Sequence, residues 1–148
     1  IEPLASAGKL GPLLWQLPPN FARDDDRLAS ALAAMPREQR HAVEFRHPSW
    51  FAPDVYALLR EHGVALVVAD RPEVHAFQSH ELTAPFTFAR FHYGTRGKRG
   101  NYSEGELEEW ARRFGRWAKD ADVYAYFNND LEAFAVRNAL RLKQLLGA

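Results

Sequence analysis

The sequence contains no cysteine among its 148 residues. This absence excludes disulfide scaffolds, thiolate metal sites and cysteine nucleophiles. Neither sign of charge is in excess, because 19 lysine and arginine residues balance 19 aspartate and glutamate residues. A balanced chain has no general electrostatic attraction to nucleic acid or to anionic membranes. Any binding of nucleic acid would therefore depend on a local basic patch.

Long apolar segments are absent too. No run approaches the roughly 18 residues that cross a bilayer, and the first residues, IEPLASAGKLG, lack the basic and apolar regions of a signal peptide. We therefore expect a soluble, cytoplasmic protein with no membrane partner. Apolar residues themselves are plentiful, since 47% of the chain is hydrophobic and 13% aromatic. Residues 1–148 have enough material for one packed domain.

Five short apolar runs are typical of β-strands, because they are rich in β-branched and aromatic residues. They are PLLWQLP (12–18), AVEFR (42–46), VALVVAD (64–70), FTFARFHY (86–93) and VYAYFN (123–128). Segments with helical spacing lie between most of them, at 24–35, 52–63, 103–121 and 131–146. The polar connection 71–85 is the exception, and it predicts an excursion over a site. The alternation predicts a parallel sheet, either doubly wound as in flavodoxin or part of a (β/α)8 barrel.

Polar residues occur at the carboxyl ends of these predicted strands. Successive side chains of a strand point to opposite faces. Counting by alternate residues puts Glu44 with Arg46 and Arg90 with His92, and it puts Asp70 on the face of Leu66 and Val68. Five coincident polar ends favour a barrel, in which they would converge in the lumen. The predicted converging set is Gln16, Glu44, Arg46, Asp70, Arg90, His92, Tyr126 and Asn128.

This set offers recognisable chemistry. Two arginines, Arg46 and Arg90, can clamp a carboxylate or a phosphate through their planar forks. Glu44, Asp70 or His92 can act as a general acid or base. The alternative is that ion pairs among these groups only hold the fold together.

A divalent metal is the cofactor to consider. His47, His92, Glu44 and Asp70 offer nitrogen and oxygen ligands. No His-x-x-x-His spacing occurs, so no residue is assigned to a metal and the cofactor stays open.

The loop GTRGKRGNY, residues 94–102, follows the fourth predicted strand directly. It combines three glycines with Arg96, Lys98 and Arg99. Such a loop can wrap a phosphate or a nucleic-acid backbone, although it matches no Walker or dinucleotide fingerprint. An ordinary solvated loop is the alternative.

Several motifs in consistent order resemble domain-of-unknown-function family 72, the YecE-like proteins. They are LLWQLPPNF, VEFRHPSWF, VVAD, ARFHYG with YSEGELEEWA, and VYAYFNND with AVRNALRLKQLL. The resemblance implies a (β/α)8 barrel truncated to about strands 4 to 8, with about three βα units upstream of Ile1. One departure is Tyr93, which stands between His92 and Gly94 where the family pattern has histidine followed by glycine. The resemblance implies no particular activity.

Three functions remain as hypotheses. The first is an enzyme acting on a small anionic or polyhydroxy substrate at the carboxyl ends of the strands. The second is a nucleic-acid-binding or phosphodiester-cleaving barrel that uses the loop 94–102. The third is a non-catalytic binding or interaction barrel with a purely structural polar lumen. A small molecule or phosphate-containing ligand is the expected partner, since the net charge does not favour nucleic acid.

Overall fold

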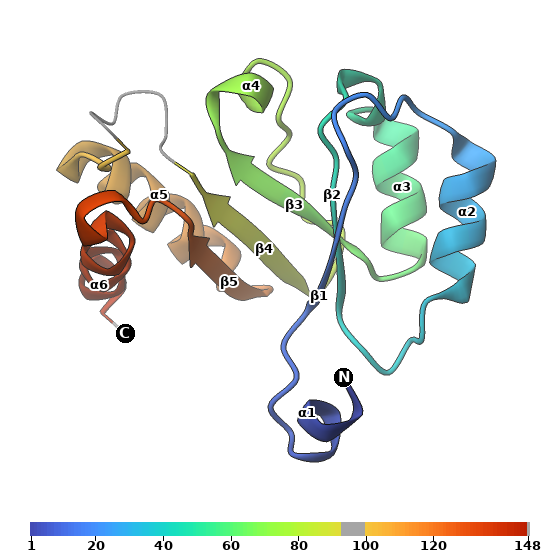
Figure 1. The fold of residues 1–148 in the computed structure, drawn as a ribbon, viewed down its shortest axis with the longest axis horizontal. Coiled ribbons are helices and arrows are strands. Elements are labelled where there is room, and N and C mark those ends of the chain that lie inside the picture. The colour runs from blue at the N-terminus through green and yellow to red at the C-terminus, as the bar shows by residue number, and fades with distance from the viewer. Residues whose placement is uncertain (93–99, 148) are drawn as a thin grey trace.

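The computed structural model describes residues 1–92 and 100–147 (Figure 1). It is an α/β fold with one five-stranded parallel sheet. The strands are β1 (Leu13–Gln16), β2 (His41–Glu44), β3 (Ala65–Asp70), β4 (Phe86–Phe91) and β5 (Asp122–Phe127). The helices are α1 (Glu2–Ser6), α2 (Asp25–Ala34), α3 (Pro53–Glu61), α4 (Pro72–His75), α5 (Glu104–Trp117) and α6 (Phe134–Leu146), with two 3-10 turns, η1 (Pro48–Trp50) and η2 (Leu131–Ala133).

The strands follow one another across the sheet in the order β1-β2-β3-β4-β5. All five predicted strands and the four predicted helices are confirmed, with small shifts at their ends. The predicted excursion 71–85 contains only the short helix α4. A flavodoxin-type sheet reverses its strand order near the middle, so the sequential order rules out that alternative.

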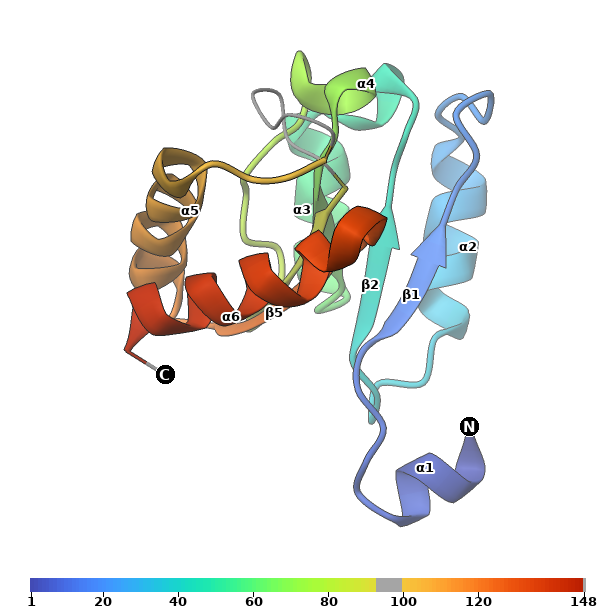
Figure 2. The same ribbon diagram turned by 60° about the vertical axis from the view of Figure 1, so that its left-hand side comes forward.

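The four longer helices all pack on one face of the sheet. The first part of their core joins α2 and α3 to Val43, Phe45 and Leu66. The second part joins α5 and α6 to Val68, Ala89 and Phe91. Figures 1 and 2 show α2 and α3 at the β1–β2 end of the sheet, with α5 and α6 together near β5. A sheet covered by its helices on one face only is not doubly wound.

The other face of the sheet, which we call the open face, has its own apolar centre. Its buried residues are Ala42, Ala65, Val67, Phe86 and Phe88, with Tyr124 packed against them. Towards the carboxyl ends of the strands, the side chains on this face become polar. The open face therefore has an apolar floor and a polar end.

Local signals explain where the helices begin. Asp24 caps α2, because its side chain accepts a hydrogen bond from the backbone N–H of Arg27. Ser103 and Glu106 form a reciprocal capping box at α5. These caps fix the ends of the loops that follow β1 and β4, and therefore the carboxyl edge of the sheet.

Candidate functional site

Four of the predicted residues meet at the carboxyl end of the open face. Gln16 ends β1 and pairs in register with Glu44 at the end of β2. The guanidinium of Arg46 donates from Nε to Glu44 Oε1 at 2.8 Å and from Nη2 to Gln16 Oε1 at 2.6 Å. Arg90 on β4 donates from Nη1 to Glu44 Oε2 at 2.5 Å and to Gln16 Oε1 at 2.8 Å. We call these four side chains the arginine cluster.

Arg90 reaches Glu44 across the intervening strand β3. Neighbouring strands lie about 4.8 Å apart, so the contact spans roughly two strand spacings. The β3 residue beside Arg90 in register is Ala69, which is buried. Because alanine carries a single methyl group, the long arginine side chain can pass over it.

Glu44 is the buried counter-ion of the arginine cluster. Its side chain is fully buried, at 0% exposure, and each carboxylate oxygen accepts from a different guanidinium. A buried carboxylate is stable only when it is paired and hydrogen-bonded. The geometry suits a residue that orients two arginines better than one that exchanges protons with a substrate.

The two arginines keep hydrogen-bond donors that the cluster does not use. A guanidinium carries five N–H donors, and each arginine uses two of them here. Arg46 Nη1 and both Nε and Nη2 of Arg90 make no hydrogen bond within the described residues. Their side chains are only 20% and 16% exposed. Partly desolvated, unused guanidinium donors attract an oxyanion.

His92 lies next to the arginine cluster. Its backbone N–H donates to the carbonyl oxygen of Asp70 at 3.2 Å, and its side chain is half-buried. Burial holds the pKa of His92 below its ordinary value, and the positive charges of Arg71 and Arg90 lower the pKa further. The ring is therefore neutral at neutral pH, and a neutral imidazole can accept a proton.

Tyr126 and Asn128 stand apart from the four clustered side chains. Tyr126 is opposite Arg90 in register, is 42% exposed, and stacks on Phe88 with ring centroids 4.6 Å apart. Asn128 is exposed, and its backbone N–H donates to the carbonyl of Phe91. Within the described residues, neither side chain forms a hydrogen bond with the arginine cluster, and a contribution of these two members of the predicted converging set to ligand binding stays a prediction.

Asp70 shares a face with Leu66 and Val68, as predicted, but the expectation that it joins the converging polar set is wrong. Leu66 and Val68 belong to the core beneath the helices, so Asp70, two residues further on, faces the helices as well. Its carboxylate accepts a hydrogen bond from Trp110 Nε1 of α5 at 3.2 Å. The open-face residues of β3 are Ala65, Val67 and Ala69, which carry no polar group. Asp70 therefore does not join the arginine cluster.

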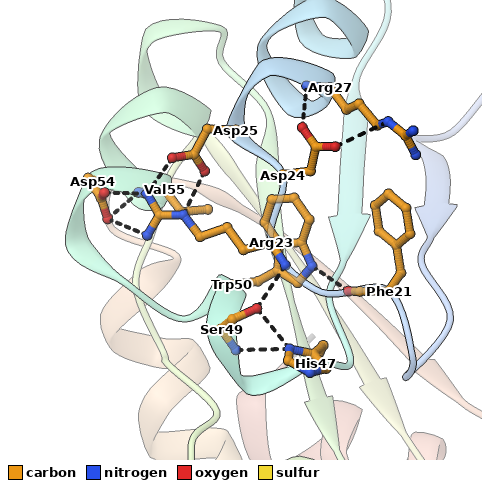
Figure 3. Close-up of polar contacts among 10 residues, drawn as sticks. All are labelled: Phe21, Arg23, Asp24, Asp25, Arg27, His47, Ser49, Trp50, Asp54 and Val55. Atoms are coloured by element: carbon orange, nitrogen blue, oxygen red, sulfur yellow. Dashed lines mark hydrogen bonds and ion pairs between the residues drawn. The ribbon is translucent and has the colours of Figure 1, made fainter.

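The loops after β1 and β2 are tied together beside the site (Figure 3). Arg23 pairs with both Asp25 and Asp54, and its backbone N–H donates to Ser49 Oγ at 2.8 Å. These contacts attach the start of α2 to the start of α3.

His47 and Trp50 have structural contacts in the same region. His47 Nδ1 interacts with Ser49 and caps the turn η1 (Figure 3). Trp50 is buried, stacks on Phe45, and donates from Nε1 to the carbonyl of Phe21. His47 is thus a cap, and Trp50 belongs to the core.

A buried amide network near β5 was not predicted from the sequence. Asn129 donates to Gly100 O at 2.6 Å and to Asn138 Oδ1 at 2.8 Å, and Asn138 donates to Asn101 at 3.1 Å. It fastens residues 100 and 101 to α6. The segment NND after the fifth predicted strand is the sequence signal for this network. The sequence does not show, however, that Asn129 is buried and Asn128 is exposed.

Several predicted features fall outside this geometry. Arg96 and Lys98, with Arg99, lie outside the described residues. Within residues 1–92 and 100–147, no group of three or more histidine, aspartate or glutamate side chains could hold a metal ion. In the same ranges, no helix is long and apolar enough to cross a membrane.

Comparison with known proteins gives the family. The family model described as protein of unknown function DUF72 matches residues 1–148. The chain belongs to the DUF72 family. Among DUF72 relatives, the chain is 25% identical to the UPF0759 protein YunF of Bacillus subtilis (strain 168), over 99% of this chain and 61% of YunF.

Solved DUF72 structures have the same fold. A DUF72 protein of Thermotoga maritima MSB8 superposes with a TM-score of 0.86 at 28% identity, over 99% of this chain and 62% of that one. A DUF72 protein of Enterococcus faecalis V583 gives a TM-score of 0.82 at 21% identity, over 99% and 62%, and shares the fold. The chain thus spans about three fifths of the length of these relatives.

Proposed function

We propose that the arginine cluster binds the anionic group of a small substrate, and that the protein is an enzyme acting on that substrate. The observation that carries the proposal is the set of guanidinium donors on Arg46 and Arg90 that have no hydrogen-bond partner within residues 1–92 and 100–147, on two side chains that are mostly buried. Donors that water reaches poorly gain more from an oxyanion than exposed ones do.

In this proposal the arginine cluster binds the substrate and His92 exchanges a proton with it. Arg46 and Arg90 hold the anion, while Glu44 and Gln16 fix the two guanidinium groups. His92 is the candidate proton acceptor, because its low pKa keeps the ring neutral. In this division Glu44 is a positioning residue rather than the acid or base.

The test is anion binding by an Arg90→Gln variant. Inorganic phosphate and acetate are titrated by calorimetry at constant ionic strength, and circular dichroism checks the fold. We expect at least a tenfold loss of affinity, since a hydrogen bond to a charged group contributes about 1.5–3 kcal/mol. Arg112→Gln is the matched control, because Arg112 is an exposed arginine on α5. If the two variants bind alike, the arginine cluster is not an anion site.

We also propose that the sheet is the later part of a closed (β/α)8 barrel. The sequential strand order and the helices on a single face support this arrangement. The greater length of the relatives supports it as well. A crystal structure of a longer chain should show further strands beside β1 and β5, and an open sheet there would contradict the proposal.

The other two hypotheses have less support. The nucleic-acid hypothesis depends on Arg96, Lys98 and Arg99, and it stays a prediction. The purely structural hypothesis expects ion pairs that are complete, whereas in the part of the chain that the structure describes Arg46 and Arg90 keep unused donors.

A further inference from the structure

The arginine cluster carries one uncompensated positive charge. Arg46 and Arg90 contribute two positive charges, Glu44 contributes one negative charge, and Gln16 is neutral. Both guanidinium groups donate to the same oxygen, Gln16 Oε1, at 2.6 and 2.8 Å, so the two positive charges lie side by side. The net charge of the four side chains is therefore that of a single cation.

Neighbouring ionisable groups leave this balance unchanged among the residues that the structure describes. Arg71 is paired with Glu73 at 3.0 Å, so this pair adds no net charge. The carboxylate of Asp70 faces the helices. His92 is neutral at neutral pH, because burial holds its pKa below the ordinary value. The single positive charge of the cluster has no counter-ion in residues 1–92 and 100–147.

A single positive charge favours an anion with a single negative charge. A charge that is removed from water is costly unless an opposite charge compensates it, and both guanidinium groups are mostly buried. A monoanion makes the occupied site neutral. A dianion replaces one uncompensated positive charge with one uncompensated negative charge, and it also loses more hydration than a monoanion.

Arg90 presents an edge of its guanidinium that suits a carboxylate. Its Nη1 donates both bonds inside the cluster, whereas neither Nε nor Nη2 makes a hydrogen bond within the described residues. Nε and Nη2 lie on the same side of a guanidinium, so their N–H groups can hold both oxygens of one carboxylate in two parallel hydrogen bonds. In Arg46 the corresponding edge is occupied, because Nε donates to Glu44 and Nη2 to Gln16.

The same edge of two other arginines binds a carboxylate within this protein. Arg23 donates from Nε to Asp25 Oδ1 at 2.6 Å and from Nη2 to Asp25 Oδ2 at 2.8 Å (Figure 3). Arg141 contacts Glu104 through Nε and Nη2 as well. Arg90 is thus an arginine whose carboxylate-binding edge has no partner among the described residues.

We propose that the arginine cluster is a carboxylate site, with the carboxylate on the Nε and Nη2 edge of Arg90 and with Arg46 as the second positive group. The substrate class is a small carboxylic acid whose anion has a single negative charge. This inference rests on the proposed function, because it uses the same two arginines and names the group that they bind.

Three probe anions separate the effect of charge from that of shape. Acetate is planar and has one negative charge, methanesulfonate is tetrahedral and has the same charge, and sulfate is tetrahedral with two negative charges. Calorimetry at neutral pH and constant ionic strength measures their affinities. We expect acetate to bind roughly tenfold more tightly than sulfate or better, with methanesulfonate between them. Sulfate that binds as tightly as acetate overturns the proposal.

Gln16→Glu tests the charge of the cluster directly. Glutamate has almost the same shape and can accept the same hydrogen bonds from Arg46 and Arg90, but it makes the cluster neutral. We expect at least about a tenfold loss of acetate affinity, with the fold retained by circular dichroism. Gln144→Glu is the matched control, because exposed Gln144 also accepts from an arginine, Arg141 Nη1, at 3.3 Å. Acetate affinity that is unchanged in Gln16→Glu contradicts the charge argument.

The outcomes distinguish this inference from the proposed function. If sulfate binds as tightly as acetate and Arg90→Gln weakens both, the carboxylate selectivity is overturned and the anion site stands. If the wild type binds none of the three anions, or if Arg90→Gln weakens none of them, both proposals are overturned. Should Gln16→Glu fail to fold, the comparison of the three anions on the wild type decides alone.

Discussion

At the scale of single residues, the fully buried Glu44 carries the clearest energetic prediction. Glu44→Gln removes the negative charge that two guanidinium groups share. Breaking a buried ion pair from one side costs about 3–5 kcal/mol, and we expect about 3 because both arginines keep some exposure. Urea unfolding measures the change. Glu104→Gln, at the exposed pair with Arg141, is the control and should have little effect. Equal effects would show that the charge of Glu44 is not needed for stability.

His92 should make the protein less stable in acid. Desolvation, followed by Arg71 and Arg90, holds its folded-state pKa below its ordinary value. The unfolded chain therefore binds more protons between the two pKa values, and the free energy of unfolding falls as pH drops through about 6.5. Above that pH the contribution is complete. In His92→Gln the loss on acidification between about pH 8 and 5 should be smaller. A pH dependence identical to that of the wild type would contradict the role of this histidine.

The residue types in the predicted strands indicate much of the candidate site, but they do not indicate which side chains contact one another in it. Glu44, Arg46 and Arg90 could be chosen because charged groups inside apolar strands need a reason to be there. Arg71 was overlooked, since it lies outside the strand pattern and only the folded chain brings it near His92. Which of Asn128 and Asn129 is buried also depends on how α6 packs, and strand periodicity does not contain that information.

At the scale of elements, the capping box of α5 offers a test that is independent of the site. Ser103 Oγ accepts from the backbone N–H of Glu106, and the Glu106 carboxylate accepts from the backbone N–H of Ser103. Ser103→Ala should lower the free energy of unfolding by about 1 kcal/mol. Thermal or urea unfolding measures it, and Ser103→Asp, which can still cap, should retain most of the stability. If both variants lose the same stability, the cap is not the cause.

Strand parity shows how far the sequence alone can go. It succeeded for β2 and β4, where charged residues alternate with apolar ones and mark the faces. For β3 it groups Asp70 correctly with Leu66 and Val68, but the run VALVVAD is apolar on both faces and does not show which of them is the open face. The expectation that Asp70, the one polar residue of that strand, converges with the polar ends of the other strands is therefore wrong. The small residues Ala65 and Ala69 on the open face were the better guide.

At the scale of the whole molecule, the sheet formed by the described residues has two unpaired edges, because β1 and β5 each have one neighbour there. Unpaired parallel edges tend to associate with other chains. We expect residues 1–148, expressed alone, to self-associate in a concentration-dependent manner, as measured by sedimentation velocity. Leu14→Lys should weaken this association, since Leu14 is an exposed residue of edge strand β1. Ser30→Lys, on the exposed side of α2, is the control, and a monomer at all concentrations would contradict the prediction.

Ala69, the β3 residue in register with Arg90, has a consequence for other proteins of the family. The single methyl group of Ala69 leaves room for a side chain of β4 to reach one of β2. A family member with a large residue at that position could not form the same contact across β3, even if it kept both charged residues. The size of this one side chain therefore indicates, from a sequence alone, which relatives can build the site.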